Sequence, residues 1–281
     1  MSRDLVLDEA VKQHLRTLKL PCIARDFREL GRQAREHGWT EEEYLLELLE
    51  REVQQRGINV AKQRLREARF PAHKTLDQFD FGFQPDLDRD KLVRLTRCEW
   101  IPAAQPVLFA GPVGTGKTHL AIALGIEATK RRHRVRFFRT DELIRSLTEA
   151  RSSHEVTRLT KRLDRVDVLI LDELGFVPFD RTGAELLFNL LAGRYQRRST
   201  VITTNLAFSE WGRVFGDDKL TAALLDRLAD GAHIVTTGGT SFRMRRSLPE
   251  ATRAEVETTQ ERAPVRACGA GGDPNVVDPR A

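Results

Sequence analysis

The chain has 281 residues, of which 40% are hydrophobic and 31% charged, and its formal net charge is +5 at pH 7. This length supports one large domain or two ordinary ones, and the composition is far from that of a disordered protein. It contains no apolar run of about 18 residues that would span a membrane, and acids near residue 1 lead us to expect no secretory leader. Its three cysteines are widely spaced. We therefore expect a reduced, cytoplasmic protein without a disulfide framework or zinc finger.

Residues 1–70 show the apolar spacing of helices throughout. Pro21 suits the first turn of one helix. Thr40 and Glu43 match a capping box and predict the start of another, which we expect Gly57 to interrupt. We interpret residues 1–70 as a small all-helical domain. It is either a bundle with a solvated charged face or a module that docks on a partner or on DNA.

The segments that follow differ in character. Residues 71–88 contain two prolines and alternating phenylalanines, which indicates a linker whose aromatic side chains pack against another part of the chain. Residues 249–281 are rich in Ala, Gly, Pro and Arg without periodicity, and we expect a disordered tail.

Between them, residues 89–248 alternate short apolar strands with helical patterns. Strands are expected at residues 107–110, 135–138, 168–171, 200–203 and 233–235. Helices are expected near residues 118–131, 141–163, 182–197 and 218–229. Because the strands are apolar on both faces, this pattern predicts an α/β fold with a five-stranded parallel sheet covered by helices.

Residues 111–118, GPVGTGKT, match the pattern GxxxxGK[ST] between an expected strand and an expected helix. Such glycines let backbone N–H groups surround phosphate oxygens, and the helix N-terminus adds its positive end. We expect Lys117 to reach the β- and γ-phosphates of a nucleotide and the Thr118 hydroxyl to bind Mg²⁺. The residues predicted to bind the nucleotide are Gly111, Pro112, Val113, Gly114, Thr115, Gly116, Lys117, Thr118 and His119.

Asp172 and Glu173 follow the apolar run at residues 168–171 and would stand at the carboxyl end of a central strand. We predict that Asp172 holds Mg²⁺ and that Glu173 orients and deprotonates the attacking water. The alternative is a pair of surface acids. A kinase-like P-loop protein needs no glutamate to activate a water molecule. The motif NKxD, with which GTPases recognise the guanine base, is absent. The pair therefore favours ATP hydrolysis.

Two further residues suit an ATPase that acts as an assembly. Asn205 ends the strand pattern at residues 200–203 and would face the γ-phosphate or the attacking water; alternatively it is a strand-end cap. Arg227 lies late on an amphipathic helix and is a candidate arginine finger for the nucleotide of a neighbouring subunit. Its alternative role is a surface salt bridge with Asp226 or Asp230.

The segments GPVGTGKTHLAIALGIEA, VLILDELGF, VITTNLAFSEWGRVFGD and LLDRLADGAHIV together resemble the IstB-like transposition helper ATPases. These are AAA+ proteins close to the DnaC-type helicase loaders. The resemblance covers residues 1–248 and implies an AAA+ fold, ATP with Mg²⁺, a ring or spiral of identical subunits, and double-stranded DNA and a transposase as partners. By position it implies four catalytic residues, which are Lys117, Glu173, the sensor Asn205 and Arg227. No helical lid follows residue 240, so Arg243 and Arg245 are not assigned as a second sensor.

Residues 130–165 carry 12 Lys and Arg against 5 Asp and Glu. Charge runs of this kind are often solvated faces, but this one lies between the two nucleotide motifs, and in the resembled family that region faces the DNA. We predict phosphate contacts with steep salt dependence. The residues predicted to contact DNA are Arg145, Arg151, Arg158, Lys161 and Arg162.

Two other functions remain open. A DnaC-like replicative helicase loader would use the same ATPase core and grip a helicase through its N-terminal segment. A nucleotide-gated DNA scaffold would turn over little ATP, and Glu173 argues against it.

Overall fold

The computed structural model describes residues 3–176, 178–239 and 241–242. Its sheet has the strands β1 (Val107–Ala110), β2 (Val135–Arg139), β3 (Val168–Leu174), β4 (Ser199–Thr204) and β5 (His233–Thr236). All neighbouring strands are parallel, in the order β2-β3-β4-β1-β5. The predicted five-stranded parallel sheet is thus confirmed. Its central strands are buried on both faces, which is why they are continuous apolar runs in the sequence.

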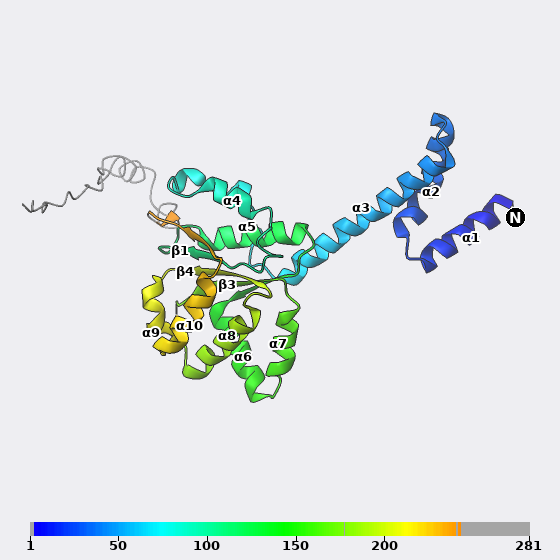
Figure 1. The fold of residues 1–281 in the computed structure, drawn as a ribbon. Coiled ribbons are helices and arrows are strands. Elements are labelled where there is room, and N and C mark those ends of the chain that lie inside the picture. Colours follow the sequence, from blue (N-terminus) through cyan, green and yellow to red (C-terminus); the bar gives the residue numbers. More distant parts are fainter. Residues whose placement is uncertain (1–2, 177, 240, 243–281) are drawn as a thin grey trace, which may run out of the picture.

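Helices cover both faces of the sheet (Figure 1). On one face lie α4 (Arg89–Leu95) and α5 (Lys117–Lys130). On the other lie α6 (Thr140–Ser152), α7 (Val156–Asp164), α8 (Arg181–Arg194), α9 (Trp211–Phe215) and α10 (Asp218–Ala229). The prediction of one continuous helix at residues 141–163 is wrong, because the structure has two helices there. The chain leaves the helix between α6 and α7, where His154 has a φ of +58°.

The N-terminal segment forms α1 (Arg3–Thr17), α2 (Pro21–His37) and α3 (Glu41–Ala68). Pro21 stands in the first turn of α2, and Thr40 and Glu43 form the predicted capping box. The expected interruption at Gly57 is wrong, since α3 runs unbroken for 28 residues. A single glycine costs a helix only about 1 kcal/mol, and a Cβ at this position would lie 2.8 Å from the Arg132 guanidinium.

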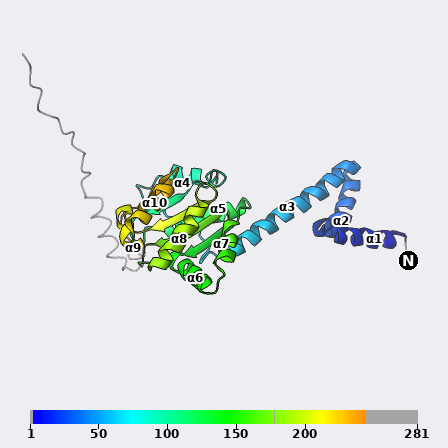
Figure 2. The same ribbon diagram turned by 60° about the horizontal axis from the view of Figure 1, so that its bottom comes forward.

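The helix α3 projects from the sheet and carries α1 and α2 at its far end (Figures 1 and 2). Its last turns pack into the core beneath α5, where Ala68 is fully buried beside Leu65. Phe70 follows the helix and meets Phe137 of β2 edge to face at 6.3 Å. Because of this packing, the end of α3 is held against the sheet domain.

The segment after α3 contains the short 3₁₀ helices η1 (Leu76–Gln78) and η2 (Phe81–Phe83). Phe79 and Phe81 pack against the same core and against each other. The tail expected at residues 249–281, and Arg243 and Arg245, lie outside the described residues. Among the helices that the structure describes, none has the length and apolarity of a membrane span.

Candidate nucleotide-binding site

The loop between β1 and α5 has the shape that its glycines predict. Gly116 caps α5 with a φ of +94°, and a Cβ there would lie 2.6 Å from the ring of Phe79. Gly111 has a φ of +145° and abuts the backbone carbonyl of Thr237, which leaves no room for a side chain. Lys117 is buried, and its Nζ donates to the carbonyl of Pro112 at 2.5 Å. The loop therefore curls around the start of α5, as a phosphate cradle requires.

Asp172 is 5% exposed at the end of β3 and faces two hydroxyls. Its Oδ1 accepts hydrogen bonds from Thr118 Oγ1 at 2.8 Å and from Thr203 Oγ1 at 2.5 Å. Hard oxygen ligands of this kind suit Mg²⁺, which normally keeps several waters and phosphate oxygens as further ligands. No cluster of three or more His, Cys, Asp or Glu able to hold a metal exists among the described residues. Thr118 and Asp172 thus fit a magnesium ion bound mainly through a nucleotide.

Glu173 leaves the strand at a bulge. Between Leu171 and Leu174 the register of β3 shifts against β4, and Glu173 has a φ of +57°. Non-glycine residues rarely adopt this conformation, and its strain is typical of functional sites. The N–H of Glu173 donates to Thr203 Oγ1 at 2.9 Å, which helps to hold the bulge. The bulge directs the neighbouring acids to different places, with Asp172 at the Thr118 hydroxyl and Glu173 at the cavity.

One cavity of about 330 Å³ brings the predicted residues together. Lys117, Thr118, Glu173 and Asn205 all line it. Asn205 reaches this place because β4 lies between β1 and β3, so the end of β4 faces both motifs. Pro112 and Gly111 shape the loop without lining the cavity. The other predicted loop residues that line it are Val113, Gly114, Thr115, Gly116 and His119.

The rest of the cavity lining comes from residues that the sequence did not predict as binding residues. These are Lys74, Gln78, Phe79, Asp80, Phe83, Phe176, Thr203, Thr204 and Phe242. The sequence predicts that the phenylalanines at residues 79–83 pack against another part of the chain, but it does not indicate that Phe79 and Phe83 line this cavity. His119 fixes this wall, since its Nε2 lies 2.8 Å from the Thr75 carbonyl and its ring meets Phe79 at 5.3 Å. Burial lowers the pKa of His119, so its imidazole is neutral at pH 7.

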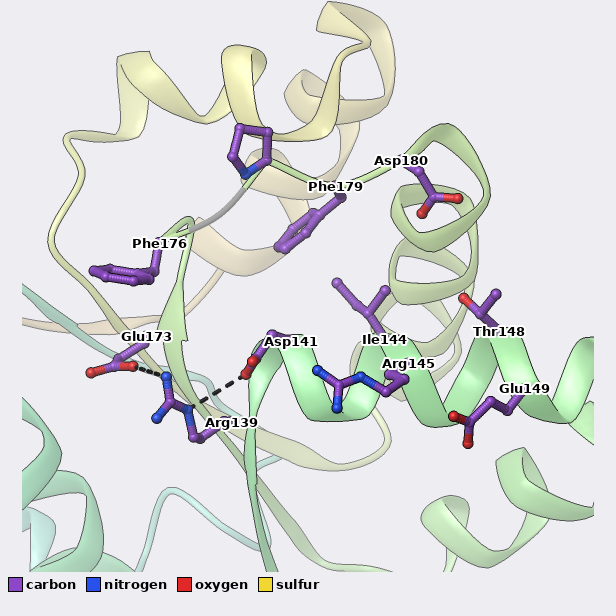
Figure 3. A pocket seen from close by; sticks show the side chains of 11 residues that line it. Arg139, Asp141, Ile144, Arg145, Thr148, Glu149, Glu173, Phe176, Phe179 and Asp180 are labelled. Carbon is purple, nitrogen blue, oxygen red and sulfur yellow. Dashed lines mark hydrogen bonds and ion pairs between the residues drawn. The ribbon is translucent and has the colours of Figure 1, made fainter.

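Arg139 is a further residue that the sequence did not indicate. It ends β2, opposite Asp172 in the parallel register. Its Nη2 lies 2.8 Å from Glu173 Oε2, and its Nε lies 3.5 Å from Asp141 Oδ1 (Figure 3). These groups line a second cavity of about 320 Å³, which also contains Arg145 of α6. Glu173 thus lies between the two cavities and is held by an arginine from the second.

Arg227 lies away from both cavities. It is half-buried on α10, and its Cζ lies 5.3 Å from the centre of the Phe188 ring. It lines a separate hollow that also includes Arg194 and Tyr195. Within the described residues it forms no ion pair with Asp226 or Asp230 at 4.0 Å or less. Arg227 is therefore not among the residues that line the cavity at Lys117 in its own chain.

The five predicted DNA residues are exposed and lie on two helices, α6 and α7. Arg158, Lys161 and Arg162 line an open hollow along α7. Arg151 is exposed near the end of α6. Arg145 points instead into the cavity beside Glu173, with Asp141 and Glu149 nearby (Figure 3).

The strand order, the phosphate loop after β1 and the acidic pair near the end of β3 define a P-loop protein of the AAA+ class. Residues 13–250 match the family model of the IstB-like ATP binding proteins, and the chain belongs to this family. This confirms the resemblance inferred from the sequence.

Similar proteins include ATP-binding proteins of insertion sequences. The insertion sequence IS21 putative ATP-binding protein of Pseudomonas aeruginosa is 38% identical over 231 residues, which are 82% of this chain and 87% of that protein. The insertion sequence IS5376 putative ATP-binding protein of Geobacillus stearothermophilus is 32% identical over 239 residues, covering 85% and 95%. The structure of AMPPCP-bound DnaA from Aquifex aeolicus has a TM-score of 0.53 at 21% identity, covering 66% of this chain and 60% of that one. This last likeness concerns the fold alone.

Proposed function

We propose that this protein is an ATP-dependent, DNA-binding helper ATPase for transposition, which assembles on target DNA and recruits a transposase. The observation that carries the proposal is the single cavity lined by Lys117, Thr118, Glu173 and Asn205. The relatives named for insertion sequences span most of both chains and favour this function over helicase loading.

Hydrolysis needs a water in line with the γ-phosphate and a base to take its proton. The carboxylate of Glu173 accepts the proton while the water oxygen bonds to the γ-phosphorus and the bond to the bridging oxygen breaks, giving ADP and phosphate. Lys117 offsets negative charge on the phosphates, and Asn205 orients the water or the γ-phosphate. Thr118 and Asp172 would hold Mg²⁺, which would neutralise phosphate charge.

The ion pair with Arg139 keeps Glu173 from the water in the free protein. Arg139 immediately precedes α6, and the hydroxyl of Thr140, the first residue of α6, donates to the carbonyl of Asp172 at 2.9 Å. Because α6 leads into the basic helix α7, DNA at this region can shift α6 and free Glu173. ATP hydrolysis is therefore slow without DNA and faster with it.

Assembly completes the site. Arg227 is remote from the cavity of its own chain, so its contact with ATP is made with the nucleotide of a neighbouring subunit. ATP then joins adjacent subunits, and hydrolysis loosens them. Basic side chains from several subunits act on one duplex, and linked weak contacts gain from effective concentration.

The test combines the protein, duplex DNA, ATP and a transposase of an IS21-type insertion sequence. ATP should increase DNA binding, and DNA should increase phosphate release. The transposase should co-sediment with protein on DNA only when ATP or a non-hydrolysable analogue is present. A protein that binds a replicative helicase instead of the transposase would establish the helicase-loader alternative.

A further inference from the structure

Arginines that form no ion pair within the described part of the chain lie where the end of α3 meets the sheet. Three arginines of α3 pair with glutamates of the same helix at 2.7–2.9 Å: Arg51–Glu47, Arg56–Glu52 and Arg64–Glu67. Among the described residues, Arg69 after α3, Arg136 of β2 and Arg162 of α7 have no carboxylate within 4.0 Å. Glu67 lies near the end of α3, but its carboxylate already accepts from Gln63 and Arg64.

Arg136 joins the two sides of this junction. The strand β2 is the edge of the sheet, and the half-buried Arg136 donates from Nη1 to the carbonyl of Glu67 at 2.8 Å. Its Cζ lies 5.2 Å from the ring centre of Phe138. Burial and, after it, the positive charges of Arg69 and Arg162 lower the pKa of Arg136. The three arginines therefore share one local field that favours an anion.

The same positive surface continues along α7. Arg158, Lys161, Arg162 and Arg165 recur at positions i, i+3, i+4 and i+7, which share one face of a helix. They line an open hollow of about 620 Å³, in which Glu155 pairs with Arg158. The opposite face of α7 packs on the core through Leu159 and Leu163. The end of α3 and α7 lie on the same side of the molecule (Figure 2).

We propose that the backbone of duplex DNA runs from α7 across the edge strand β2 to the end of α3, with one phosphate at Arg162 and another at Arg69. This inference rests on the proposed function that the chain binds duplex DNA, and it adds contacts outside the basic segment between the nucleotide motifs. An extended, open row of cations suits a regular array of phosphates better than a single small anion.

The consequence concerns the N-terminal helices. Since α3 is one rigid helix that ends on this row, DNA held at Arg69 fixes the direction in which α3 carries α1 and α2 (Figure 1). A partner bound to α1 and α2 would then have a defined position relative to the duplex. Arg136 is a positioning residue here, because its hydrogen bond to the Glu67 carbonyl holds the end of α3.

The test uses the full chain, a random-sequence duplex and a non-hydrolysable ATP analogue, with fluorescence anisotropy at several salt concentrations. The variants are Arg69→Gln, Arg162→Gln and Arg69→Lys, with Arg51→Gln as the control, since Arg51 is paired on the same helix. The affinity falls as salt rises, and losing one phosphate contact should make the slope of log affinity against log salt less steep by about 0.9 per subunit. A lower slope means this weaker dependence on salt. We expect this decrease in both glutamine variants, a slope near wild type in Arg69→Lys and Arg51→Gln, and an unchanged melting temperature throughout.

Two results would overturn the inference, and they can be told apart. If Arg162→Gln lowers the slope but Arg69→Gln does not, the chain binds DNA along α7 alone and the path to α3 is wrong. If the wild-type chain shows no salt-dependent binding to the duplex, the proposed function fails as well. Because Arg69 and Arg162 are both exposed, neither substitution removes packing.

Discussion

Removing the side chain of Arg139 should raise the rate of ATP hydrolysis without DNA. In the structure the Glu173 carboxylate is held by Arg139 at 2.8 Å, and the two side chains are 37% and 49% exposed, respectively. An ion pair this exposed contributes about 0.2–1 kcal/mol. Freeing Glu173 by that amount corresponds to a rate increase of about 1.4- to 5-fold, since tenfold requires about 1.4 kcal/mol.

The assay is steady-state phosphate release by full-length Arg139→Ala and wild type at saturating ATP, with and without duplex DNA. The variant should be faster without DNA and should gain less from DNA. The difference should shrink at high salt, which screens an exposed pair. Asp141→Asn is a matched control, because it removes the other ion pair of Arg139 and leaves the one with Glu173. Its rate without DNA should not rise.

A slower Arg139→Ala variant with undiminished ATP binding would refute this reasoning. Arg139 would then assist hydrolysis directly, and its pairing with Glu173 would be part of the active arrangement.

The other predictions follow from the same geometry. Lys117→Ala should abolish ATP binding, while Glu173→Gln should keep binding and stop turnover, because Glu173 acts only on the attacking water; equilibrium nucleotide binding and phosphate release separate these outcomes. Arg227→Ala should bind ATP as a monomer but lose cooperative DNA binding; a variant that still assembles normally with ATP would contradict the shared site. A fragment that starts at residue 60 should bind ATP, whereas one that starts at residue 75 should lose about 2 kcal/mol or more of stability in denaturant unfolding, because it lacks the buried end of α3.

The parts of the site that the sequence predicted are those encoded by contiguous residues. The phosphate loop lies between a strand and a helix, so residues 111–118 define both its shape and its place. Asp172 and Glu173 near the end of β3 were predictable in the same way, because they directly follow the apolar run at residues 168–171. Asn205 could be expected at the site because parallel strands end at one edge of a sheet.

The missed residues act through neighbours that are distant in the sequence. Arg139 meets Glu173 only because β2 pairs with β3, and Thr203 meets Asp172 only because β4 lies on the other side. No spacing pattern in one chain indicates such pairs. The expected break at Gly57 was wrong for a similar reason, since the C-terminal end of α3 is held by packing against the sheet. The predicted DNA residues were grouped by charge alone, and the sequence did not indicate that Arg145 would line the cavity beside Glu173.

The central claim is that ATP in the cavity at Lys117 joins subunits into an active assembly on DNA. The most direct measurement is the ATPase rate per subunit as a function of protein concentration, with and without duplex DNA, together with the oligomeric state at each concentration. We expect the rate per subunit to rise with protein concentration, to rise at lower concentration when DNA is present, and to follow the formation of oligomers. A rate per subunit that is the same at all concentrations in a protein that stays monomeric would contradict it.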